Sequence, residues 1–324
     1  MDTDICAGCK YSLKNFLSMC ENDDRLKEFL KVHGVIDCAD VIICPKCNKP
    51  CKFFERHNKY VCNTTTVVVN ARNRRVRQRC GFIQTSRKNT FFSGSKKSVQ
   101  EICQFVAFWL VGFKQEQLEL ETEWSRRTVV DWVSFCREVC FIIVRDHTEP
   151  LGGPGKIVEI DEAKFGRRKY NRGRIIEGQW IFGGIERESK KVFMVPVADR
   201  SQDTLLEIIK EWILPETTVM SDCWRSYDCL ENEGFQHLKV NHSLNFVDPD
   251  TGAHTQNVER LWRDIRFDIP RFGRRSDNFV YYLAEHYFHR KFPKFTDRFH
   301  EFFKYIAEVY PPTDTQHEGE GTSS

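Results

Sequence analysis

Residues 157–166, IVEIDEAKFG, form an apolar run that passes directly into two carboxylates, Asp161 and Glu162. The start, rich in Ile and Val, is typical of a buried β-strand. An acid at the end of such a strand either keeps the strand end soluble or forms one wall of a metal site. Successive side chains of a strand point to opposite faces, so Glu162 is expected to face away from Asp161. The choice depends on whether acids elsewhere in the chain can reach Asp161.

The sequence after this strand alternates between strand and helix patterns, and a Gly/Pro-rich linker at 149–156 marks a domain boundary before it. Strands are expected at 178–186, 190–197, 217–222 and 235–242, and helices at 201–213, 255–268, 276–291 and 294–308. Three adjacent strands with short connections, followed by parallel strands, have the order of an RNase H-like domain. The expected fold class is therefore α/β, with an RNase H-like mixed sheet flanked by helices.

Two further acids of this domain can meet Asp161. Asp222 ends the strand expected at 217–222, and Glu259 lies on the helix expected at 255–268. Two carboxylates about 4 Å apart at an effective dielectric of about 20 repel each other by about 4 kcal/mol, so converging acids need a cation. Mg²⁺, or Mn²⁺ in its place, prefers such oxygen ligands. Two ions could activate an attacking water or 3′-hydroxyl and stabilise the leaving oxygen of a phosphodiester.

The segment 41–95 has the cysteine pattern of a zinc ribbon, because a CxxC pair is followed by two further cysteines. The expected structural Zn²⁺ ligands are Cys44, Cys47, Cys62 and Cys80. Cys51 and the pair Cys6 and Cys9 are alternative ligands, because the last two expected ligands are 18 residues apart. The chain has 14 cysteines and no apparent secretory signal, which favours reduced thiols and metal binding in an intracellular compartment.

Helical periodicity fills the segment 96–150. Three helices are expected there, and the last begins after a Ser cap with Arg126 and Arg127 near its N-terminus. This pattern fits a helix-turn-helix that presents two basic side chains to DNA, and a plain helical spacer is the alternative.

Basic residues are concentrated in two stretches, although the net charge is only +3. The stretch 72–88 contains seven Lys or Arg and no acid, and the stretch 164–174 contains six and no acid. Such clusters are typical of a nucleic-acid partner. The expected DNA-binding residues there are Arg72, Arg74, Arg75, Arg77, Arg79, Lys164, Arg167, Arg168, Lys169, Arg172 and Arg174. No window approaches 18 uncharged apolar residues, so no membrane partner is expected.

Three blocks of this sequence resemble, in order, the motifs of the Merlin superfamily of DDE transposases, which are related to a group of bacterial insertion-sequence enzymes. The blocks are IVEIDEAKFG, VMSDCWRSY and HTQNVERLWRDIR. The resemblance spans roughly residues 40 to 295. It implies cut-and-paste DNA transposition by an Asp-Asp-Glu triad, which corresponds to Asp161, Asp222 and Glu259.

The resemblance also suggests roles for residues around the triad. Arg266 lies seven residues after Glu259 on the same helix face, where a basic residue could hold a DNA phosphate. His254 and Asn257 are possible supporting residues, and some relatives use Asn at the third catalytic position. The family acts on paired transposon ends and target DNA, usually as a dimer or higher oligomer. A nuclear location is expected if the source is eukaryotic, and otherwise an intracellular location on DNA.

The expected domains are an N-terminal helical segment at 1–40, a zinc-ribbon-like segment at 41–95 and a helix-turn-helix-like region at 96–150. An RNase H-like catalytic domain at 151–310 and a disordered tail at 311–324 complete the chain. A domesticated DNA-binding protein without catalysis is the alternative function, and a plain RNase H-like nuclease is a second one.

Overall fold

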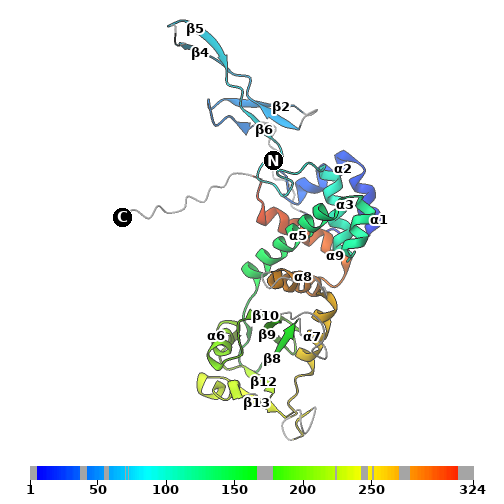
Figure 1. Cartoon of the computed structure of the whole chain (residues 1–324), viewed down its shortest axis with the longest axis vertical. Coiled ribbons are helices and arrows are strands. Elements are labelled where there is room, and N and C mark those ends of the chain that lie inside the picture. The colour runs from blue at the N-terminus through cyan, green and yellow to red at the C-terminus, as the bar shows by residue number, and fades with distance from the viewer. Residues whose placement is uncertain are drawn as a thin grey trace. The chain divides into compact units, whose positions relative to one another are not determined.

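The computed structural model describes residues 6–36, 42–54, 58–69, 71, 73–165, 178–222, 225–241, 247–249, 252–269 and 278–312. The chain folds as two units, of which unit 1 comprises residues 1–139 and 292–324, and unit 2 comprises residues 140–291. Figure 1 shows the elements of both units. None of the helices in the described ranges is long and apolar enough to span a bilayer.

Unit 2 is built on a five-stranded sheet with the order β10-β9-β8-β12-β13. The strands are β8 (Ile157–Phe165), β9 (Gln179–Glu186), β10 (Val192–Val197), β12 (Thr218–Asp222) and β13 (Gln236–Val240). β8, β9 and β10 pair antiparallel, whereas β12 runs parallel to both β8 and β13. Numbered along the chain, this is the 3-2-1-4-5 order of an RNase H-like sheet. The fold class expected from the sequence is confirmed.

Helices cover both faces of this sheet, as Figure 1 shows for α6 and α7. The helices of unit 2 are α6 (Gln202–Trp212), α7 (Gln256–Asp268) and α8 (Phe279–Lys291), and a short pair β7 (Leu151–Gly152) and β11 (Ile213–Leu214) lies outside the sheet. Val158 and Ile160 of β8 pack in a core with α6. Ala163 and Phe165 pack in a second core with α7 and α8. Alternate residues of β8 therefore face two different helical layers.

Unit 1 combines a helical part with two small sheets. Its helices are α1 (Leu13–Cys20), α2 (Asp23–Val32), α3 (Val99–Leu110), α4 (Gln115–Thr122), α5 (Arg126–His147), which continues into unit 2, and α9 (Phe295–Val309). One sheet has the order β1-β2-β3-β6, with β1 (Ile42–Ile43), β2 (Pro50–Phe54), β3 (Lys59–Val61) and β6 (Ile83–Thr85). The other is a two-stranded ribbon of β4 (Thr65–Val69) and β5 (Arg75–Arg79).

The last helix, α9, packs within unit 1, whereas the sequence placed it at the end of the catalytic domain. Phe299 stacks on Phe16 of α1 with ring centroids 4.6 Å apart, and Phe303 meets Phe29 of α2 edge to face. These rings are fully or almost fully buried, and they form a core in which α1 and α2 pack against α9. Unit 2 is therefore inserted in the sequence of unit 1. Residues 313–324 of the expected tail lie outside the described residues.

Candidate active site

Asp161 and Asp222 lie on neighbouring parallel strands of the unit 2 sheet. Thr218 of β12 pairs with Ile157 of β8, and Met220 pairs with Glu159, so paired residues differ by 61 in number. Asp161 and Asp222 differ by the same 61, and Asp222 is the last residue of β12. Strand register thus brings together two acids that are distant in the sequence.

The environment of Asp161 disfavours its charge. Burial raises the pKa of Asp161 to about 7, and the negative charges of Glu162 and Asp222 act in the same direction. A carboxyl with this pKa is only partly ionised at neutral pH. The charges of the two aspartates therefore interact across the neighbouring strands, as expected for carboxylates that could share a cation.

Glu162 belongs to the opposite face of β8. Burial raises its pKa, and the nearby Tyr227, which is fully buried in the α6 core, opposes the rise. This placement agrees with the alternation along the strand and separates the two adjacent carboxylates of the opening motif.

Helix α7 is docked onto β8 directly above Asp161. The indole Nε1–H of Trp262 donates a hydrogen bond of 3.0 Å to Asp161 Oδ2. Gly183 of β9 pairs with Asp161, and a Cβ there would lie 2.8 Å from the Trp262 ring and 2.7 Å from the carbonyl oxygen of Phe193. A glycine within a strand often marks such a close approach. Gly183 therefore leaves the space through which the indole reaches Asp161.

Glu259 stands one helical turn before Trp262 on α7, so both lie on the same side of the helix. The Thr255 hydroxyl donates a hydrogen bond of 3.3 Å to Glu259 Oε1. Among the described residues, however, Asp161, Asp222 and Glu259 are not one of the groups whose ligand atoms all lie within 4.8 Å of one another. The structure thus brings the two aspartates together and places the helix with Glu259 beside them, without drawing the third carboxylate into the pair.

A fourth acid, which the sequence reasoning missed, fixes this helix. Glu159 lies two residues before Asp161 on the same face of β8, and its side chain is fully buried. Its carboxylate accepts hydrogen bonds from the backbone N–H groups of Asn257 (2.9 Å) and Val258 (3.2 Å) at the start of α7. A carboxylate at a helix N-terminus satisfies otherwise unpaired N–H groups and interacts favourably with the helix dipole.

Two side chains complete the surroundings of Glu159. Arg187 Nε donates to Glu159 Oε1 at 2.7 Å, and its Nη2 donates to the carbonyl oxygen of His254 at 2.8 Å. The Asn257 amide also donates to Oε1, at 2.7 Å, and His254 Nδ1 lies 3.5 Å from the same oxygen. His254 and Asn257 are thus supporting residues of the helix start. The Asn257 amide group bonds on both sides, since its Oδ1 also accepts a hydrogen bond of 3.2 Å from Lys190 Nζ.

Comparison with known proteins matches this part of the chain. The ISXO2-like transposase domain matches residues 150–290. An uncharacterized transposase-like protein of Haemophilus influenzae is 32% identical over 96 residues, which are 29% of this chain and 76% of the bacterial protein. The chain belongs to the ISXO2-like transposase family. The relationship to insertion-sequence DDE transposases expected from the three sequence blocks is confirmed.

Two solved structures are also similar to this transposase-family chain. One is a chain of a cryo-EM structure of a simian T-cell lymphotropic virus intasome in complex with a PP2A regulatory subunit, with 15% identity and a TM-score of 0.29; 56% of this chain and 66% of that chain are covered. The other is the catalytic core domain of BIV integrase, with 14% identity and a TM-score of 0.29 over 42% of this chain and 84% of that chain. The RNase H-like assignment rests on the strand order and directions of unit 2.

Basic side chains expected near the acids are only partly described. Lys164 is an exposed residue near the end of β8, with its ammonium 5.2 Å from the centre of the Trp180 ring. Arg266 is exposed on α7 and stacks over Phe165, with its guanidinium carbon 5.3 Å from the ring centre. Both stay available to a phosphate, since a cation over a ring keeps its charge. Arg72, Arg167, Arg168, Lys169, Arg172 and Arg174 lie outside the described residues.

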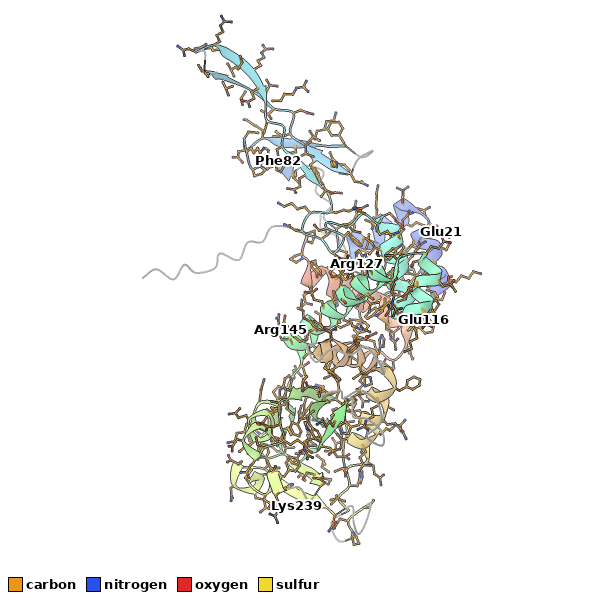
Figure 2. The ribbon with its side chains drawn as sticks, in the orientation of Figure 1. Glu21, Phe82, Glu116, Arg127, Arg145 and Lys239 are labelled. Carbon is orange, nitrogen blue, oxygen red and sulfur yellow. The ribbon has the colours of Figure 1, made fainter. Side chains whose placement is uncertain are left out.

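The basic residues of unit 1 fall on two exposed elements. Arg75, Arg77 and Arg79 alternate along β5, and Arg74 precedes them; all four are exposed. Arg126 and Arg127 occupy the exposed first turn of α5, after a left-handed residue, Glu123, that ends α4. Figure 2 labels Arg127 on this helix.

Four cysteines of unit 1, here called the Cys44 group, meet as the sequence predicted. Their Sγ atoms all lie within 4.8 Å of one another, with 3.5 Å between Cys44 and Cys80 and 3.4 Å between Cys47 and Cys62. Thr64 lowers the pKa of Cys62 to about 6 through its hydroxyl and backbone N–H. Cys51 is buried beside this group but is not one of the four. The described cysteines are all free thiols, so these sulfurs are able to bind a metal ion.

The long gap between the last two members of the Cys44 group has a structural cause. The Cys62 N–H donates to Phe82 O at 2.9 Å, and the Cys80 N–H donates to Thr64 O at 2.8 Å. The β4–β5 ribbon is inserted between these two bonded positions. The two cysteines are therefore close in space although they are 18 residues apart in the sequence. Cys6 and Cys9 do not join this group; they meet two histidines elsewhere in unit 1.

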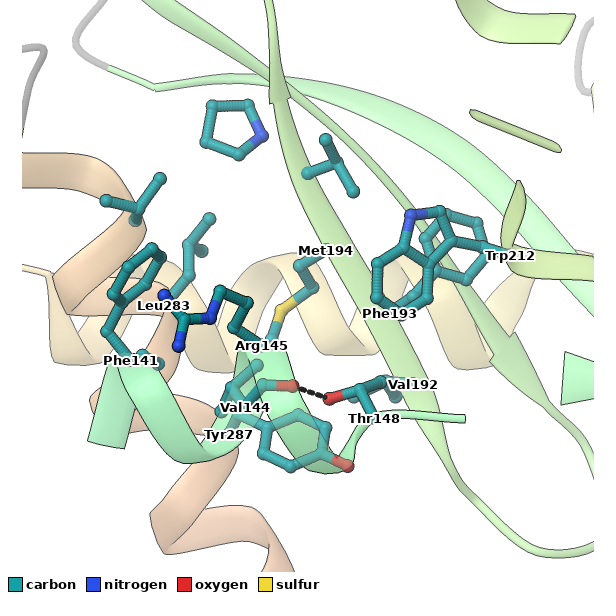
Figure 3. Close-up of a pocket in the computed structure, with 14 residues that line it drawn as sticks. Phe141, Val144, Arg145, Thr148, Val192, Phe193, Met194, Trp212, Leu283 and Tyr287 are labelled. Atoms are coloured by element: carbon teal, nitrogen blue, oxygen red, sulfur yellow. Dashed lines mark hydrogen bonds between the residues drawn. The ribbon is translucent and has the colours of Figure 1, made fainter. Parts of the chain in front are cut away.

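Unit 2 also contains an apolar cavity of about 200 Å³ (Figure 3). Its lining comes from the end of α5, the edge strand β10 and α8, and includes Phe141, Met194 and Tyr287. None of the expected catalytic or basic residues lines it. It is therefore separate from the carboxylate pair.

Proposed function

We propose that this transposase-family chain binds the terminal inverted repeats of a DNA element and catalyses metal-dependent strand cleavage and strand transfer. The observation that carries the proposal is the pairing of Asp161 with Asp222 by strand register, with the helix that bears Glu259 docked above them. Family membership supports the proposed reaction class, and the carboxylate geometry supports its proposed location.

The donor set fits a hard divalent cation. Carboxylate oxygens are preferred by Mg²⁺ and Mn²⁺, and a bound cation would offset the burial and carboxylate repulsion that raise the pKa of Asp161. A bound cation supplies Lewis acidity and an activated water or 3′-hydroxyl. Asp161 and Asp222 are its ligands in this proposal, and Glu259 completes the set once a cation removes the repulsion between the three acids.

In this proposal, Trp262 and Glu159 position this set without touching the substrate, whereas two basic side chains contact the DNA. Trp262 holds one oxygen of Asp161 and leaves the other oxygen for the metal. Glu159 binds the backbone at the start of α7, and this contact holds the helix that carries Glu259 close to β8. Lys164 and Arg266 lie at the end of β8 and on α7, where they contact DNA phosphates in the proposed complex.

Replacement of Glu259 by Gln tests the proposal at its third ligand. We expect plasmid nicking in Mg²⁺ or Mn²⁺, and joining of duplexes that carry the flanks of the gene, to fall by about 10²- to 10³-fold, because one anionic ligand is lost. Binding of the same duplexes should remain within about threefold of wild type, because Glu259 is not a phosphate contact. Rates and affinities are measured side by side, with EDTA as a metal-free control.

A matched variant is Glu188→Gln, which changes an exposed acid in the turn between β9 and β10. It should retain wild-type cleavage. If Glu259→Gln cleaves as well as Glu188→Gln, then Glu259 is not a catalytic ligand. If the wild-type chain binds duplex ends but never cleaves them with either metal, the alternative of a domesticated DNA-binding protein is favoured.

The β4–β5 ribbon is the best candidate for DNA-end binding. Its cross-strand pairs include Val67 with Arg77 and Val69 with Arg75, so the arginines of β5 share one face with these valines. Val67 and Val69 are 62% and 60% exposed, which is unusual for valines. Figure 2 shows side chains projecting outward along this ribbon. This exposed face of the two-stranded ribbon is both basic and apolar, which favours the binding of a partner that would cover it.

DNA meets the requirements of such a partner. Alternate residues of a strand are about 7 Å apart, and a two-stranded ribbon fits the major groove. In the groove, arginines bind phosphates or guanine edges, and valines contact thymine methyl groups. An isolated two-stranded hairpin is only marginally stable, so zinc bound by the Cys44 group would anchor its base. In this proposal, Arg126 and Arg127 of α5 add a second DNA contact, and two chains act together on paired ends.

Simultaneous replacement of Arg75, Arg77 and Arg79 by Ala tests the ribbon. We expect the variant to bind DNA ends more weakly. The slope of a plot of log Kobs against log salt concentration should become shallower by about 0.9 for each phosphate contact that is lost. The control replaces three exposed lysines on α1 and α2, Lys14, Lys27 and Lys31, by Ala and removes the same charge. Fluorescence anisotropy across a salt series measures both. Equal slopes for the two triple variants would exclude a specific role for the ribbon.

A further inference from the structure

A second group of metal-ligand side chains lies in unit 1, apart from the carboxylates and from the Cys44 group. It consists of Cys6, Cys9, His33 and His300 and is called the Cys6 group. Its four ligand atoms all lie within 4.8 Å of one another. Cys6 and Cys9 precede α1, His33 ends α2, and His300 lies on α9. The group thus joins the first residues of the described chain to its last helix.

The distances within the Cys6 group have the size of tetrahedron edges. Zn–S bonds of about 2.3 Å and Zn–N bonds of about 2.0–2.1 Å give ligand separations of about 3.8 Å for S–S, 3.6 Å for S–N and 3.3 Å for N–N. Cys9 Sγ lies 3.4 Å from His33 Nε2 and 3.6 Å from His300 Nδ1. The two ring nitrogens are 3.1 Å apart. Three ligands thus lie at tetrahedral separations, and Cys6 Sγ lies within 4.8 Å of each of them, so a slight adjustment would let all four surround one ion.

His33 is oriented as a metal ligand, and both histidines of the group are buried. His33 Nδ1–H donates a hydrogen bond of 2.7 Å to Phe29 O, so the lone pair of Nε2 points into the group. Metal-bound histidines commonly use their second ring nitrogen in this way. Both rings are nearly fully buried, with 5% exposure for His33 and 6% for His300. Burial lowers the pKa of both imidazoles and keeps them neutral, which is the form that binds metals.

The backbone supports the same arrangement. The Cys6 N–H donates to Val32 O at 3.1 Å, which holds the cysteine segment against the end of α2. The Tyr11 N–H donates to Thr296 O at 3.4 Å, which holds the same segment against the start of α9. Gly8, between the two cysteines, has φ 144°, a conformation that glycine adopts readily. The Cys-Ala-Gly-Cys turn is therefore shaped to direct both sulfurs to one point.

We propose that the Cys6 group is a second structural zinc site, a Cys₂His₂ centre that fastens the N-terminal segment to α9. All four positions are filled by protein, so the site is closed and has no place for a substrate. Cys9 and His300 are 291 residues apart, and the whole of unit 2 lies between them in the sequence. The ion clamps the two chain segments that enclose the inserted catalytic unit. This role is independent of the proposed DNA cleavage.

Zinc analysis of the full chain, purified with a reductant and dialysed, tests this assignment. We expect about two zinc ions per chain in the wild type, one from each closed site. Cys6→Ser combined with His300→Ala should lose one ion and keep the other. Cys44→Ser combined with Cys47→Ser should lose the other. Cys229→Ser, a thiol outside both groups, is the control and should lose none.

A ligand-swapped variant keeps the test decisive if the first double variant does not fold. His300→Cys retains four ligands, so it should keep the zinc of the Cys6 group. With Co²⁺ in place of zinc, its sulfur-to-metal absorption should be stronger, because the site gains a third thiolate.

One zinc ion per wild-type chain, with none left after Cys44→Ser/Cys47→Ser, would overturn the proposal. A disulfide between Cys6 and Cys9 in protein isolated from a reducing compartment would also overturn it. A Co²⁺ spectrum of His300→Cys that is identical to that of the wild type would show that His300 is not a ligand.

Discussion

Replacement of Asp161 by Asn is expected to abolish strand cleavage while stabilising the metal-free protein at neutral and alkaline pH. Cleavage should fall by at least about 10³-fold, because a metal ligand worth several kcal/mol of transition-state stabilisation is lost. Stability should rise because the substitution removes a buried charge beside Asp222 and Glu162. The Asn side-chain oxygen can still accept the hydrogen bond from Trp262.

The direction in which folding shifts the pKa of Asp161 determines how the stability of the protein depends on pH. The pKa of Asp161 is raised from 3.8 to about 7 on folding, so the folded protein binds more protons than the unfolded chain between these values. The free energy of unfolding of the metal-free protein should therefore fall as pH rises from about 4 to about 7. The full difference is at most about 4 kcal/mol. Asp161→Asn should lack this fall, and the two proteins should differ most above pH 7.

Urea unfolding in EDTA at pH 5 and pH 8 measures both effects, and Glu188→Gln is the exposed-acid control. Added Mg²⁺ should stabilise the wild type and leave Asp161→Asn unchanged. A variant that cleaves normally would remove Asp161 from the catalytic set. A variant that is less stable than wild type at pH 8 would contradict the charge repulsion argued for the pair.

Replacement of Glu159 by Ala is expected to destabilise unit 2 by about 3–5 kcal/mol, which is the usual result of removing one partner of a buried ion pair. The Arg187 side chain is only 18% exposed, so its guanidinium would lose its bonded carboxylate in a poorly solvated place. The backbone N–H groups of Asn257 and Val258 would also lose their acceptor. The start of α7 would be freed from β8, and cleavage should fall although Glu159 binds neither metal nor DNA.

An exposed ion pair of the same unit provides the control. Glu149 and Lys191 are 3.2 Å apart, with side chains 77% and 58% exposed, so Glu149→Ala should change stability by less than about 1 kcal/mol. Urea midpoints of the two variants give the comparison. Equal midpoints would mean that Glu159 does not anchor α7. Glu159→Gln should lie between wild type and Glu159→Ala, because it keeps an acceptor but loses the charge.

Local pattern determined a large part of this molecule. The change from helical to strand periodicity after the 149–156 linker, and the order of strands and helices, were sufficient for the RNase H-like sheet. Asp161 and Asp222 could be recognised because each follows an apolar run, although only Asp222 ends its strand, and β8 continues past Asp161 to Phe165. The Cys44 group could be recognised because one CxxC pair limits where its remaining ligands are found. Each of these signals is a short stretch of sequence that can be recognised without knowing which distant residues it meets.

Only the tertiary structure revealed the parts that depend on long-range contacts. Glu159 is 98 residues from Asn257, and His33 is 267 residues from His300. A buried Glu inside an apolar strand, and two isolated histidines on helices, have no local pattern that names their partners. The same reason explains why the sequence does not indicate that α9 packs against α1 and α2: its apolar face is visible in the sequence, but the surface that it covers is not. Periodicity in the sequence specifies which side of a helix or strand is buried. Only the tertiary packing decides which other element covers that side.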